Sequence, residues 1–221
     1  MQKFDTPAPV TVVLDVPGGR VQLIAAERTD TTVEVRPAEP GRNRDVQAAE
    51  HTAVAFADGV LRITTAATGG RLLGPTGSLE VTVQLPAGSA VRGRAAAAEL
   101  RAVGRLGDVA FDGAYHRTKI DEAASLELTA VDGDVEVGRL GGPARITTTR
   151  GDIRVTEARG GTVELSTQSG NITVGAAAGV SAALDAGTGH GRVSNALRNH
   201  GTTVLDIRAT TSHGDITAHS L

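Results

Sequence analysis

The C-terminal half of this chain repeats one short pattern about every twenty residues. Each unit reads as an alternating strand, a stretch rich in Thr and Ser, a glycine usually followed by Asp or Asn, and a second alternating strand. The glycines stand at positions 133, 151, 170, 191 and 214. Because one such unit cannot cover its own apolar face, the repeat predicts an all-β solenoid of stacked coils, with 18–23 residues per coil.

Apolar and polar residues alternate within these segments, which is the pattern of strands that bury one face. We therefore expect the apolar positions to stack into two interior columns. The first column is predicted to contain Val135, Ile153, Ile172, Val193 and Ile216. The second is predicted to contain Leu128, Ile146, Leu165, Leu184 and Ile207.

Composition agrees with such a thin aliphatic interior. The chain has three Phe, one Tyr, no Trp and one Met, while Val, Leu, Ile and Ala are abundant. The 28 glycines suit corners at which the backbone takes a positive φ, and an adjacent Asp or Asn can hydrogen-bond to the turn amides.

The first part of the chain is less regular. A short helix is expected at about 43–51 and a loop at 68–78, and Ala95–Ala98 is assigned to a strand or turn. Thr118 and Lys119 are expected in the Gly-Asp positions of a weaker unit. We predict one domain over 1–221, with N-terminal strands and a cap region in 1–95 and regular coils in 96–221. Further strands are expected at 11–16, 20–25, 31–37, 53–56, 60–65 and 79–86.

The chain resembles the bacterial putative-adhesin family of β-strand-repeat proteins, a family of unknown function. The likeness lies in the opening MQKFDTPAPV, in LEVTVQLPAGSAV, in the Gly-Asp-Ile/Val units and in the ending RATTSHGDITAHS. This resemblance implies a single-stranded, right-handed parallel β-helix and carries no catalytic residue over to this chain. The Ala, Gly, Arg and Val bias is typical of an actinobacterial source.

Charge and cysteine content exclude several classes of function. The formal net charge is −3 and the only lysines are Lys3 and Lys119, so no basic cluster is available for a nucleic acid. No cysteine is present for disulfides or thiolate metal sites. The N-terminus lacks a signal peptide or a membrane-spanning segment, which predicts a cytoplasmic protein, or an exported one if an N-terminal segment is missing.

The repeated Asp and Asn are weighed as calcium ligands. Asp134, Asp152, Asn171 and Asp215 share one position of the repeat, and Arg192 takes it in the remaining unit. Calcium-binding nonapeptide repeats have a shorter period and two glycines before the Asp. We therefore favour a turn role, and keep Asp152 and Asp215 only as weak metal candidates.

His190 and His213 share the position before the glycine, and could lie close enough to bind a metal or to repel in acid. His200 is the only obvious third candidate, so exposed loop histidines are the favoured interpretation. Arg150-Gly151-Asp152 spells a cell-attachment tripeptide, but the repeat already explains its glycine and aspartate.

No catalytic or cofactor-binding residue is predicted, because the chain has no G-x-S-x-G, no phosphate-binding loop and no dinucleotide-binding motif. Since little chain follows strand 216–218, the last coil should expose an unpaired edge. We expect a non-enzymatic scaffold or interaction module that binds a protein or self-associates. A monomer covered by 195–203 or by the early segment, a surface adhesin, and a polysaccharide-active β-helix enzyme remain alternatives.

Overall fold

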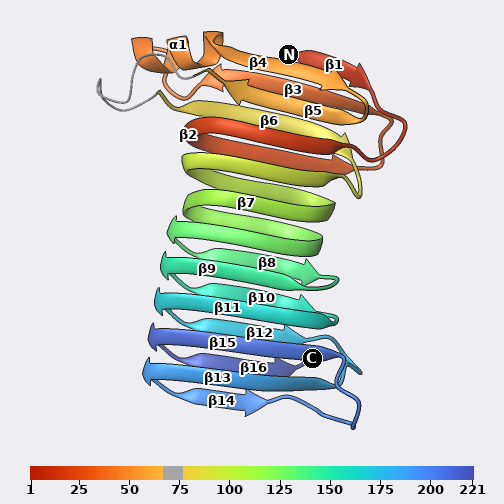
Figure 1. The fold of residues 1–221 in the computed structure, drawn as a ribbon, viewed down its shortest axis with the longest axis vertical. Helices are drawn as coiled ribbons and strands as arrows, with labels where there is room; N and C mark the ends of the chain where they lie inside the picture. Colours follow the sequence, from red (N-terminus) through yellow and green to blue (C-terminus); the bar gives the residue numbers. More distant parts are fainter. Residues whose placement is uncertain (67–76) are drawn as a thin grey trace.

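The strands of the protein form one open sheet that winds down the long axis of the molecule (Figure 1). The computed structural model describes residues 1–66 and 77–221. Sixteen strands of this sheet and one helix lie in the described residues. The predicted all-β fold class is therefore confirmed, whereas the expected loop at 68–78 falls almost entirely outside the described residues.

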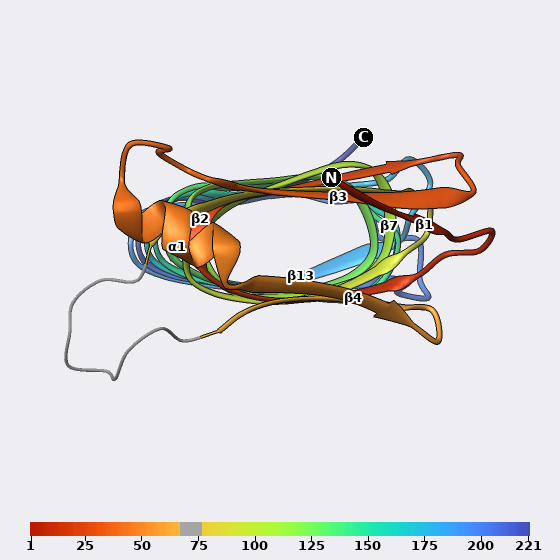
Figure 2. The same cartoon turned by 90° about the horizontal axis from the view of Figure 1, so that it is seen from above.

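At the N-terminal end of the stack, antiparallel strands lie along the two long sides and the helix lies at one short side (Figure 2). On one side β1 pairs with β3 and β3 with β6, and on the other side β4 pairs with β5, all antiparallel. The elements of this end are β1 (Gln2–Asp5), β2 (Thr11–Ala26), β3 (Asp30–Pro37), α1 (Asn43–Glu50), β4 (Thr52–Ala57), β5 (Val60–Thr65) and β6 (Leu79–Pro86). The predicted helix at 43–51 is thus confirmed.

Two sets of contacts hold this end together. The rings of Phe4, on β1, and Phe56, on β4, lie 5.4 Å apart and so join the two sides of the end. The buried carboxylate of Asp45, in the first turn of α1, accepts hydrogen bonds from the backbone N–H of Ser78 at 2.9 Å and of Glu39 at 3.2 Å. Two of the four Phe and Tyr rings are therefore used where the stack begins, and the coils below depend mainly on aliphatic packing.

Below this end, successive strands pair in parallel as coils of similar length. These strands are β7 (Ala90–Asp132), β8 (Val135–Leu140), β9 (Ala144–Arg150), β10 (Ile153–Ala158), β11 (Gly161–Ser169), β12 (Ile172–Ala176), β13 (Ala182–His190), β14 (Val193–Ala196), β15 (Leu205–His213) and β16 (Ile216–Ser220). The long strand β7 bends around the corners without interruption (Figure 1). It includes Ala95–Ala98, which confirms the strand assignment of that segment.

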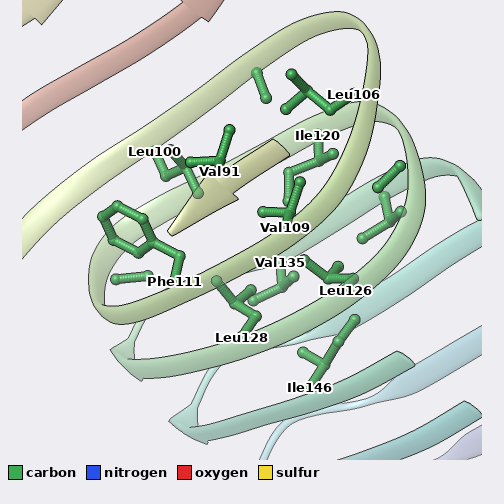
Figure 3. Close-up of a cluster of buried hydrophobic side chains, with 14 of the residues drawn as sticks. Val91, Leu100, Leu106, Val109, Phe111, Ile120, Leu126, Leu128, Val135 and Ile146 are labelled. Carbon is green, nitrogen blue, oxygen red and sulfur yellow. The ribbon is translucent and has the colours of Figure 1, made fainter. Parts of the chain in front are cut away.

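Aliphatic side chains fill the interior of the coils (Figure 3). Val91, Leu100, Leu106, Val109 and Phe111 point inward from β7, above Val135 and Ile146 of the following strands. Each of these side chains is at most 2% exposed. Stacking of small and branched residues thus builds the core, as the composition indicates.

The last two coils lie in inverted order relative to the sequence. β15 pairs with β11 on one side and β13 on the other, and β16 lies between β12 and β14. The predicted first column keeps its five members, but Ile216 stacks between Ile172 and Val193. Residues 205–220, which we call the inserted coil, therefore separate residues 182–196, the end coil, from the body of the stack.

The second predicted column is only partly correct. Leu128, Ile146 and Leu165 do stack on one another. Ile207, however, pairs with Val163, and Leu184 pairs with Ile207, two positions earlier along the strand. The reason is that the corner glycine sets the register. Ala209 and Ala186 lie five positions before Gly214 and Gly191, as Leu165 does before Gly170, and these alanines therefore continue the column of Leu165.

The weaker unit predicted around Thr118 is also displaced. Thr118 pairs with Val135, so His116 and Arg117 occupy the positions that correspond to Gly133 and Asp134. His116 accordingly has a positive φ of 66°, a conformation unusual for a residue other than glycine. The assignment of Thr118 and Lys119 to the Gly-Asp positions is therefore wrong by two residues.

An ion-pair cluster beside the covered end gives a pH prediction. The Arg28 guanidinium, at 2.8 Å, and the Lys3 ammonium, at 3.2 Å, lower the pKa of the Asp30 carboxyl from 3.8 to about 2. Because the folded-state pKa is lowered, the stabilisation is fully present above pH 3.8 and is lost as the pH falls through about 2. A carboxyl NMR titration should show this, and Arg28→Gln should move the pKa upward; an Asp30 that titrates near 3.8 in the wild-type protein would contradict it.

Candidate functional site

The glycine corner between the two strands of each coil is built by close stacking of backbone on backbone. Gly151 has a φ of 126°, and a Cβ at this residue would lie 2.2 Å from the carbonyl oxygen of Gly133 in the coil above. Gly170, Gly214 and Gly191 repeat this contact down the same corner, in that spatial order. Only glycine satisfies both the backbone angle and the contact.

The residues after these glycines form a continuous ladder of hydrogen bonds, which we call the corner ladder. Each side-chain Oδ1 accepts the backbone N–H at the same position of the next coil. The bonds run from Asp152 N–H to Asp134 (2.9 Å), Asn171 N–H to Asp152 (2.7 Å), Asp215 N–H to Asn171 (2.8 Å) and Arg192 N–H to Asp215 (2.8 Å). The ladder can end on an arginine because no described strand lies beyond the end coil.

Threonines three residues before the glycines add a second set of bonds, which sequence reasoning missed. The hydroxyl groups of Thr167, Thr211 and Thr188 each donate to a corner glycine carbonyl of the adjoining coil, at 3.2, 3.0 and 2.9 Å respectively. The recurring T-x-x-G spacing was the available signal for this role. Together, the ladder and the threonines satisfy polar groups that the corner would otherwise leave without partners.

The corner ladder makes a prediction that separates the turn role from the metal role. Replacing Asp152 by Ala removes the acceptor for the Asn171 amide and should cost about 1 kcal/mol of stability. Asp152→Asn keeps that acceptor and should leave the urea midpoint close to wild type, with no calcium-dependent rise in melting temperature for either protein. A calcium-dependent rise in the wild type that Asp152→Asn abolishes would instead establish a metal site.

The two candidate histidines come together at the lower end of the stack. His190 and His213 occupy paired positions on β13 and β15, with ring centroids 4.8 Å apart and planes inclined by only 3°. Within the described residues, no group of three His, Cys, Asp or Glu is placed to hold a metal ion. His200 lies apart from the pair, with its backbone N–H bonded to Ser181 Oγ.

The Arg-Gly-Asp tripeptide is engaged in the coil structure. Arg150 forms an ion pair with Asp132 at 2.7 Å, Gly151 belongs to the glycine corner, and Asp152 caps the amide of Asn171. All three residues thus have structural roles that follow from the repeat.

The open edge of the stack belongs to the end coil, not to the predicted strand 216–218. Ile216–Ser220 is paired on both sides, whereas β13 and β14 have no strand on their outer side among the described residues. Val193 on β14 is 46% exposed, but Ile216 beside it is only 1% exposed. The prediction of an unpaired terminal edge therefore holds for residues 182–196 and is wrong for residues 216–218.

The loop 197–204 runs along the side of the last coils. Arg198 N–H donates to Ser220 Oγ at 2.9 Å, and the Arg198 carbonyl accepts from the N–H of Ala182 at 3.0 Å. Leu197 packs against the core as a partly buried side chain. The backbone of β13 and β14 nevertheless keeps its outer side free of any described strand.

A shallow groove of about 780 Å³ crosses one face of the coils and is lined by charges of both signs. Arg145 and Glu164 in this groove form an ion pair at 2.6 Å, and Asp108 accepts a hydrogen bond from Ser125 at 2.6 Å. Arg145 and Glu164 therefore neutralise one another within the groove. In the described residues, no helix is long and apolar enough to cross a membrane.

Comparison with known proteins adds a family and a fold. A family model described as Toastrack DUF4097 matches residues 9–219. A Bacteroides fragilis structure named a putative adhesin is 16% identical, covers 98% of this chain and 95% of its own, and has a TM-score of 0.51. A putative cell adhesion protein from Clostridium sporogenes is 11% identical, covers 100% and 98%, and has a TM-score of 0.45. No curated protein matches the sequence.

Proposed function

Since this chain belongs to the Toastrack DUF4097 family, we propose that it is a non-enzymatic interaction module whose open edge receives a β-strand from a protein, including another copy of itself. The observation that supports this proposal is the difference between the two ends of the stack. At one end the parallel coils give way to the short antiparallel edge strands β1 and β4, which an aromatic contact joins, and α1 packs beside them. The other end is a regular coil, and apart from the Ala182 N–H, which donates to Arg198, the outward amides and carbonyls of β13 and β14 pair with no described strand and can accept an added one.

Ala186, in the middle of β13, offers a test with a matched control. The Ser181 carbonyl accepts from Leu205 N–H on the inner side, whereas the Ala182 N–H donates to the Arg198 carbonyl of the loop. Alternation along the continuous β13–β15 register therefore directs the N–H of Ala186, like that of Ala182, outward. Ala186→Ser keeps the outward donor, whereas Ala186→Pro removes it at an edge position that tolerates proline.

Affinity capture from the native host should use three baits: the wild type, Ala186→Ser and Ala186→Pro. We expect partners that pair with the edge to be retained by the first two baits and lost from the third. Partners that bind all three baits equally, with none that distinguishes them, would contradict a role for the open edge.

A surface-binding role like that of an adhesin is the second candidate, and the name of the Bacteroides fragilis protein supports it. An exported protein would be found at the cell surface or outside the cell, and a scaffold in the cytosol, which is the location that we propose first. Fractionation of the native host with an antibody against the chain distinguishes the two. We further propose a right-handed coil, in agreement with the usual hand of parallel β crossovers.

The absence of catalysis is part of the proposal. Its support is that the groove is shallow and that two of its charged side chains, Arg145 and Glu164, are engaged with each other in an ion pair. Incubation with acidic polysaccharides should give no unsaturated products, and their appearance would favour the β-helix enzyme alternative.

A further inference from the structure

The open edge consists of two strands, which limits the kind of partner that can complete it. β13 and β14 belong to one coil and lie on its two sides, joined at the corner of Gly191 (Figure 1). A single added peptide strand would pair with one of them and leave the other open. A partner that pairs with β13 and β14 at once must present two strands at the same spacing.

A second copy of the end coil is such a partner. We propose that two chains associate head to head through residues 182–196, with β13 antiparallel to the partner's β13 and β14 antiparallel to the partner's β14. This inference rests on the proposed function and names its partner. A two-fold axis across the stack pairs each strand with its own equivalent, so nine residues face nine and four face four.

The side chains of the end coil favour close approach of two such edges. β13 contains Gly187 and Gly189, and the whole coil contains neither the lysines nor the prolines that often protect edge strands. Its only charged residues besides His190 are Asp185 and Arg192, so it carries no net charge when the imidazole is neutral. Two copies therefore meet with little electrostatic repulsion.

Apolar surface is also available at this edge. Val193 is 46% exposed, while Leu184 and Ala186 are partly buried at the edge of the core cluster. Pairing of two end coils would enclose these side chains between the copies, as Ile216 is enclosed between Ile172 and Val193 within one chain. The covered N-terminal end offers no equivalent coil, so the assembly closes at two copies and does not extend into a filament.

Light scattering tests the inference on the purified full chain. We expect the wild type and Ala186→Ser to approach twice the mass of one chain as concentration rises, and Ala186→Pro to remain single under the same conditions. Circular dichroism establishes that both variants fold. A single-chain mass for the wild type throughout would overturn the second-copy inference, while the capture experiment would still test the proposed function separately.

A cross-linking measurement does not depend on the proline variant. The chain contains no cysteine, so Ser194→Cys, exposed on β14, places one thiol at the open edge, and Ala55→Cys places one on exposed β4 at the covered end. Mild oxidation should link two Ser194→Cys chains much faster than two Ala55→Cys chains. Equal rates for the two variants would overturn the head-to-head arrangement.

Discussion

Gly151→Ala should destabilise the coils by about 4 kcal/mol, the combined cost of an unfavourable backbone angle and of overpacking. The added Cβ would lie 2.2 Å from the carbonyl oxygen of Gly133, which is backbone and cannot move away as a side chain could. Its φ of 126° also disfavours any L-residue with a side chain. Urea unfolding monitored by circular dichroism measures the loss.

Gly187→Ala is the matched control for this experiment, because a Cβ there meets nothing within 4 Å and its φ is not in the positive range. Its unfolding midpoint should stay close to that of the wild type. Since each coil contacts only its neighbours, hydrogen exchange in Gly151→Ala should increase first in the coils around residues 133–170. Equal midpoints for the two variants would show that the glycine corner does not require glycine.

The second large effect concerns the order of the last two coils. Ile216→Ala should cost about 3 kcal/mol, because a fully enclosed aliphatic side chain leaves a cavity when truncated. Val193→Ala should cost less than about 1 kcal/mol, since its side chain is 46% exposed at the open edge. Ile172→Ala, at a position that is 0% exposed, provides the reference for full burial.

Stacking in sequence order would give the opposite ranking, with Val193 enclosed and Ile216 at the end. A larger loss for Val193→Ala than for Ile216→Ala, measured by urea unfolding, would therefore disprove the inverted order. Hydrogen exchange adds an independent check, because the amides of β16 should be better protected than those of β14, which has one free edge.

Side-chain chemistry agrees with the inverted order. In one exposed row, Arg208 lies between Glu164 and Asp185, whereas sequence order would place these two acids side by side. Arg208 contacts Glu164 at 3.5 Å. The corner ladder likewise passes from Asn171 through Asp215 to Arg192, and sequence order would put an arginine, which cannot accept an amide hydrogen bond, in its middle.

One of these residues offered a sequence signal for the inverted order of the last two coils. Among the residues that follow the five corner glycines, Arg192 is the one without an acceptor side chain, which marks its coil as the end of the ladder. We predicted the open edge correctly as a feature and placed it on the wrong strand, because we assumed that spatial order follows chain order. His190 and His213 were considered as residues close enough to interact, and their rings do stack, although exposed loop histidines were the favoured interpretation. The cytoplasmic location and the actinobacterial source stay predictions.

The amino-acid sequence alone determined the local rules of this protein: strands that bury every second residue, corners that need glycine, and a coil of about twenty residues. These rules act within one coil and between any two coils, so they are satisfied almost equally well by either order of the last two. Only the tertiary structure decided that order. It depends on which neighbour encloses Ile216, caps the Arg192 amide and separates Glu164 from Asp185, and those are contacts between residues far apart in the chain.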